Sequence, residues 1–61
     1  MKATIRQEII DDGLLIPVDN EEDWVDGNIR ATFEARFNGP DFEINLDGRW
    51  VQAISMDFEL Y

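Results

Sequence analysis

Strict alternation of apolar and polar residues from Asn28 to Asn38 is the feature that most limits the folds open to this chain. The apolar members occupy every second position, namely Ile29, Ala31, Phe33, Ala35 and Phe37. Successive side chains of a strand point to opposite faces of a sheet, so this period of two predicts a strand with one buried and one wet face. We therefore expect a β-sheet with this segment inside it.

A second strand is expected directly afterwards, because Phe42, Ile44 and Leu46 alternate with polar residues. The intervening Asn38-Gly39-Pro40-Asp41 has the composition of a turn. A four-residue loop there predicts a register that keeps every apolar pair on one face. The expected pairs are Phe37 with Phe42, Ala35 with Ile44, and Phe33 with Leu46.

The next connection, Asp47-Gly48, is a strong hairpin signal that allows two registers. A plain two-residue loop would pair Leu46 with Arg49 and place Trp50 on the wet face. A longer loop with a bulge at Gly48 would bring Trp50 beside Ile44 in the core. We favour the bulge, because the core side then holds Trp50, Ile54, Met56, Phe58 and Leu60.

The first third of the chain predicts another hairpin. Ala3 to Ile10 and Leu14 to Val18 flank Asp12-Gly13, which would form its two-residue turn. Both faces of this hairpin would be apolar. The acidic stretch that follows is expected to be a loop, in which Asn20 caps a single helical turn beginning with Glu21.

Together these elements predict one all-β domain that spans residues 1–61. Its expected architecture is a five-stranded, mostly antiparallel sheet, made of the N-terminal hairpin and a three-stranded meander. Such a sheet would curl into a small open barrel or a half-barrel closed by a dimer. Because an open sheet leaves unpaired edges, we expect a homodimer formed through the first or last strand.

Catalytic chemistry is poorly represented in this chain. It has no Cys and no His, its only lysine is Lys2, and a domain this small has little room for a cleft of about 300 Å³ or more. Asp19, Glu21 and Asp23 have the spacing that opens a calcium loop, but Trp24 and Arg30 stand where that loop needs its glycine and its glutamate. We expect no enzyme activity, no cofactor and no metal.

No run of about 18 apolar residues, the length that crosses a membrane, occurs in the sequence. A cytoplasmic protein is therefore expected, in the host cytoplasm if the source is a phage.

Charge is the most informative feature for function. The chain has 14 acidic and 5 basic residues, a net charge of −9, which disfavours direct binding to nucleic acids or membranes. The excess lies between Gln7 and Gly27, a segment without Lys or Arg. Trp24 lies within this segment, either as a lid folded over the barrel or as a binding anchor ringed by charge.

Two functions from different classes fit these features. The first is a non-enzymatic acidic module, of the kind that phages or plasmids encode as inhibitors, which imitates nucleic-acid charge and blocks a basic, nucleic-acid-binding surface of a partner protein. Its expected contact residues are Asp11, Asp12, Asp19, Glu21, Glu22, Asp23, Trp24 and Asp26.

The second is a small accessory β dimer whose acidity only keeps it in solution. The segment Gly13 to Pro17 resembles the short strand of swapped-hairpin antitoxin and transition-regulator domains, a likeness limited to the first third of the chain. That resemblance implies an antitoxin-like dimer. The basic residues through which those domains bind DNA are missing from this sequence.

Overall fold

An open, five-stranded antiparallel sheet is the larger of two sheets in this protein, seen in a computed structural model that describes residues 1–26 and 31–61. Its strands are β1 (Lys2–Ile5), β4 (Thr32–Asn38), β5 (Asp41–Leu46), β6 (Arg49–Gln52) and β7 (Phe58–Leu60), in the spatial order β6-β5-β4-β1-β7. A short 3-10 helix, η1 (Ser55–Asp57), precedes β7. A five-stranded antiparallel sheet is confirmed, but the segment expected to pair with β1 is not part of it, and the described residues form no closed barrel.

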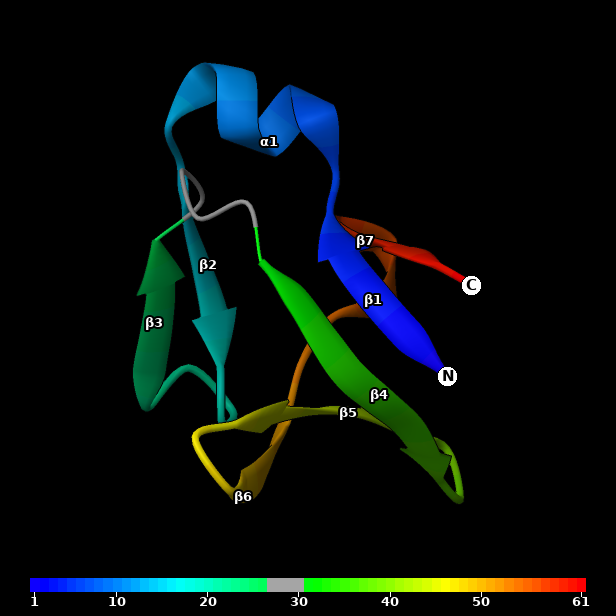
Figure 1. Cartoon of the computed structure of the whole chain (residues 1–61). Helices are drawn as coiled ribbons and strands as arrows, with labels where there is room; N and C mark the ends of the chain where they lie inside the picture. Colours follow the sequence, from blue (N-terminus) through cyan, green and yellow to red (C-terminus); the bar gives the residue numbers. More distant parts are fainter. Residues whose placement is uncertain (27–30) are drawn as a thin grey trace.

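A separate two-stranded sheet completes the fold. It is the hairpin of β2 (Leu15–Val18) and β3 (Asp23–Asp26), and α1 (Gln7–Asp12) connects β1 to it across one end of the molecule (Figure 1). Apolar side chains from both sheets form one core. Its buried members are Ala3, Ile5, Ile16, Val18, Val25, Ala35, Phe42, Ile44, Val51 and Phe58.

The predicted pairing of the two alternating segments is largely confirmed. Phe37 lies opposite Phe42 and Ala35 opposite Ile44, with Asn38 and Asp41 closing the turn. The ladder ends at Ala35, however, and Phe33 pairs with Ala3 of β1 rather than with Leu46. Asn28, Ile29 and Arg30, the first part of the predicted strand, lie outside the described residues.

The bulge at Asp47-Gly48 is a wrong prediction. Leu46 pairs with Arg49, and Asp47 and Gly48 have φ values of 52° and 97°, so the loop is the plain two-residue one. Two successive left-handed residues give a turn whose twist matches that of the flanking strands. This register puts Val51 opposite Ile44 in the core and turns Trp50 to the other face.

Trp50 is stabilised on that outer face instead. The guanidinium of Arg36 lies 4.1 Å from the centre of its ring, and Arg36 also donates a 2.8 Å hydrogen bond to Glu43. The prediction that the residues from Trp50 to Leu60 form one strand with an apolar core side is also wrong, because the chain leaves β6 and turns at η1. Phe58 is buried, whereas Ile54, Met56 and Leu60 are exposed.

The predicted N-terminal hairpin does not exist. Residues Gln7 to Asp12 form α1, and Gly13, with φ 66°, ends this helix through its N–H group, which donates to the carbonyls of Ile9 and Ile10. Glycine adopts this left-handed C-terminal conformation without steric cost, so Asp12-Gly13 marks a helix end rather than a hairpin turn. β1 consequently lies inside the sheet, between β4 and β7, and has no free edge for a dimer.

The strand that does pair with β2 comes from the stretch predicted to be a loop. β3 pairs antiparallel with β2 and places Ile16 opposite Val25 in the core. The predicted helical turn after Asn20 is also wrong, because Asp19, Asn20 and Glu21 all have positive φ values, between 55° and 65°. Three consecutive left-handed residues reverse the chain between the two strands.

Candidate functional site

The acidic residues expected to form one contact surface fall into two groups. Asp11 and Asp12 end α1, whereas Asp19, Glu21 and Glu22 lie in the turn between β2 and β3. Figure 1 shows that α1 and this turn lie at opposite ends of the hairpin. Asp23, Trp24 and Asp26 belong to β3, between these ends.

Part of this negative charge is neutralised within the molecule. Arg49 of β6 reaches Asp19 at 3.3 Å and Asp23 at 3.1 Å, both at their Oδ2 atoms. Together with a 2.8 Å hydrogen bond from the Asp19 backbone N–H to the Gln52 carbonyl, these contacts hold the hairpin turn against β6. The acidic segment has no base of its own, but Arg49 from β6 neutralises these two carboxylates.

The outward face of the hairpin carries an apolar surface that we name the hairpin patch, formed by Leu15, Pro17 and Trp24. Pro17 lies directly opposite Trp24, and Leu15 lies opposite Asp26, so all of them share one face. Leu15 is 60 % exposed and Trp24 is 53 % exposed. Trp24 is thus a half-exposed strand residue and not a lid folded over the core.

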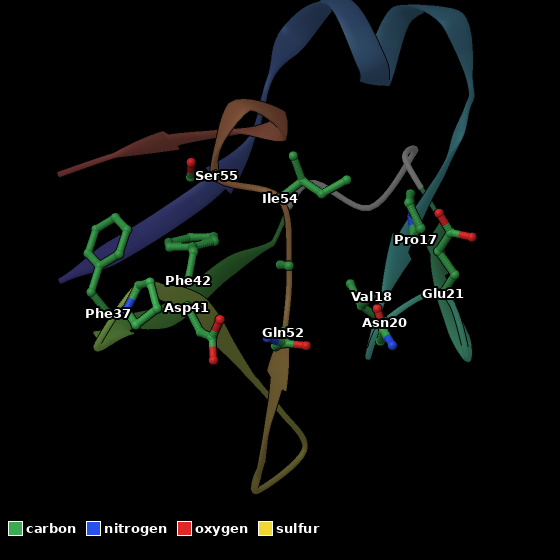
Figure 2. A pocket seen from close by; sticks show the side chains of 12 residues that line it. Pro17, Val18, Asn20, Glu21, Phe37, Asp41, Phe42, Gln52, Ile54 and Ser55 are labelled. Carbon is green, nitrogen blue, oxygen red and sulfur yellow. The ribbon is translucent and has the colours of Figure 1, made fainter.

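A groove opens where the hairpin turn approaches the large sheet. It has a volume of about 350 Å³, larger than expected for so small a domain. Figure 2 shows Pro17, Val18, Asn20 and Glu21 on one side, Phe37, Asp41 and Phe42 on the other, and Gln52 and Ile54 between them. Its polar side chains are two carboxylates, Glu21 and Asp41, two amides, Asn20 and Gln52, and the hydroxyl of Ser55.

The ionisable groups with shifted pKa values lie away from both surfaces. Lys2 bonds to Glu34, which raises the pKa of the lysine and lowers the pKa of the glutamate. Lys2 is therefore held as an ammonium ion, a poor state for a nucleophile. Burial raises the pKa of Asp57, and the nearby Arg6 partly opposes this shift.

The described part of the chain has no preformed metal site. It contains no group of three or more His, Cys, Asp or Glu side chains placed to hold an ion. Two members of the calcium-like spacing, Asp19 and Asp23, bind Arg49 instead. No helix among residues 1–26 and 31–61 is long and apolar enough to span a membrane.

Sequence patterning did not reveal the groove. Its walls come from three separate segments, and the residues that shape it were assigned to strands or turns for other reasons. The one sequence signal for the groove was an excess of apolar residues, since Phe37 and Ile54 fitted predicted core positions yet are exposed.

Comparison with models of known families, with curated proteins and with solved structures finds no match to this chain.

Proposed function

We propose that this protein is a non-enzymatic binding module that docks on a basic surface of a partner protein through the hairpin patch. The observation that supports this most strongly is the exposure of Trp24 and Leu15 on the same face of the hairpin of a small acidic protein. Aromatic side chains of this kind are enriched at the centres of protein interfaces, where they supply much of the binding energy.

Charge complementarity points to a basic partner. Asp26 shares the outward face with Trp24, and Glu22 and Asp12 are exposed at the two ends of the hairpin. The net charge of −9 would steer a positively charged partner toward this surface and repel acidic proteins and nucleic acids. The finer form of the proposal is that the partner surface is one that otherwise binds nucleic acid, whose phosphates these carboxylates would imitate.

The test is capture from a lysate of the source organism, with Trp24→Ser as the variant. We expect the wild-type protein to retain a basic protein that mass spectrometry identifies, and salt to release it because charge contributes to the contact. Trp24→Ser should reduce the captured amount at least tenfold, as expected for an interface residue worth about 2 kcal/mol or more. Duplex DNA should compete with the module if the partner surface binds nucleic acid.

Met56→Ser provides the matched control, because Met56, at 78 %, is the most exposed large apolar side chain among the described residues and belongs to η1 rather than to the hairpin. This variant should capture the partner as well as the wild type does. Equal losses in both variants, or none in Trp24→Ser, would contradict the proposed surface. The remaining function would then be an accessory protein whose acidity serves solubility.

We also propose that the protein forms a homodimer through the free edge of β7, the last strand. Within residues 1–26 and 31–61, β7 pairs only with β1, and the exposed Leu60 and Tyr61 lie on or beside its other edge. Unpaired strand edges with apolar neighbours associate readily. Light scattering at high micromolar concentration should give twice the monomer mass of 7.1 kDa, and a value of 7.1 kDa would rule the dimer out.

A further inference from the structure

We infer that the groove between the hairpin turn and the large sheet is a binding site for an arginine side chain presented by an extended peptide segment. The inference rests on the proposed function only for the basic character of the partner, since the groove shares Pro17 with the hairpin patch but is lined by neither Leu15 nor Trp24. It assigns a ligand chemistry to Phe37, Asp41 and Glu21, residues that the hairpin patch does not include.

The apolar part of the groove fits the hydrocarbon stem and flat guanidinium of arginine. Val18 and Phe42 are buried and contribute its inner surface, while Phe37, 55 % exposed, stands at its rim. Guanidinium groups are attracted to aromatic faces. The protein already contains one such contact, between Arg36 and Trp50.

The two carboxylates of the groove, Glu21 and Asp41, have no cationic partner among the described residues. Every Lys and Arg side chain that the structure describes forms an ion pair with an acid elsewhere, as in Lys2–Glu34, Arg6–Glu59, Arg36–Glu43 and Arg49 with Asp19 and Asp23. Glu21 and Asp41 form no ion pair or side-chain hydrogen bond with any residue in the described ranges. A cation from outside would thus meet two free carboxylates on opposite walls (Figure 2).

The hydrogen-bonding groups favour arginine over lysine. The side-chain oxygens of Asn20, Gln52 and Ser55 lie around the groove beside the two carboxylates. A guanidinium offers five N–H donors in a fixed fork, whereas an ammonium is a compact point charge that holds its water more strongly. The volume of about 350 Å³ is at the low end for ligand pockets, so it suits a side chain and its flanking backbone.

The test uses two synthetic probes and the amide resonances of the protein. The probes are the N-acetylated tripeptide amide Ala-Arg-Ala and its analogue with citrulline, which has nearly the same shape but no charge. The arginine probe should shift the amide signals of Asn20, Gln52, Ala53 and Ser55, and the citrulline probe should bind at least tenfold more weakly.

Three conservative variants separate this groove from general acidity. Glu21→Gln and Asp41→Asn should each weaken the arginine probe about threefold, in line with exposed charge pairs. Glu22→Gln is the matched control, because Glu22 is a neighbouring exposed acid of the same turn that does not line the groove. It should change the affinity by less than a factor of 1.5, well below the effect of either groove variant.

Equal binding of the two probes, shifts confined to β3, or equal weakening by all three variants would overturn the inference. The outcome is independent of the hairpin patch, because Trp24→Ser should leave probe binding unchanged. If the probe fails to bind while Trp24→Ser still loses the captured partner, the groove inference is wrong and the proposed function stands.

Discussion

Replacing Phe58 by alanine is expected to destabilise the protein by about 3–5 kcal/mol and to leave much of it unfolded at 25 °C. Phe58 is 1 % exposed, and its ring contacts Phe33 at 6.2 Å and Phe42 at 5.7 Å between centroids. It joins β7 to the middle of the sheet, so alanine would leave a cavity at the centre of the core. A domain of 61 residues has a total stability of only about 3–9 kcal/mol.

Trp50→Ala is the control for this prediction, although tryptophan is the larger side chain. Trp50 is 36 % exposed and packs under Arg36 on the outer face, so its loss should cost about 1 kcal/mol. Urea unfolding followed by circular dichroism measures both variants. If Trp50→Ala proved as destabilising as Phe58→Ala, Trp50 would belong to the core and the plain loop at Asp47-Gly48 would be incorrect.

The second large effect is expected at Ile16, where alanine should cost about 2–5 kcal/mol. Ile16 is 1 % exposed and faces Val25 across the hairpin, so it anchors the two-stranded sheet to the core. Its chain neighbour Leu15 points outward and is mostly exposed, so Leu15→Ala should change stability by about 0.5 kcal/mol at most.

Thermal unfolding of the two variants gives a direct comparison of adjacent residues of equal size. A lower midpoint in Ile16→Ala and an unchanged midpoint in Leu15→Ala would support the register of β2 on β3. The reverse result would mean that the hairpin presents its other face to the sheet, and it would remove the exposed Leu15 from the hairpin patch.

Local patterning was sufficient for the β4–β5 hairpin. Alternation over Phe33 to Phe37 and again over Phe42 to Leu46 left only one register that places Phe33, Phe37 and Phe42 on the same face, and a segment of turn composition joins the two strands. For the hairpin at Asp47-Gly48 the pattern did not decide between two registers. Apolar residues occur on both faces of its second strand and the residues that follow, namely Trp50 and Ile54 on one face and Val51 and Ala53 on the other. The wrong register was favoured because it placed Ile54, Met56 and Leu60 on the core side. In the structure these residues follow β6 and are exposed.

For the proposed contact surface, the sequence supplied candidate residues but not their arrangement. The acids between Asp11 and Asp26 are all present and nearly all exposed, and Trp24 is exposed among them. Their division between two ends of a hairpin, and the pairing of Asp19 and Asp23 with Arg49, depend on contacts between distant segments. The groove depends on such contacts even more, since three separate segments line it.

The sequence by itself determined that this is a small acidic β protein without thiol or imidazole chemistry, and it determined the β4–β5 pairing. Tertiary structure alone decided the conformation of two of the three Asp-Gly pairs, since the same dipeptide ends α1 at Gly13 and forms a hairpin turn at Gly48. Both sites accept left-handed glycine at no steric cost, so local preference cannot separate them. What separates them is long-range burial: β1 gains two strand partners only if the chain turns away through α1, and β2 then pairs with the otherwise unpartnered β3.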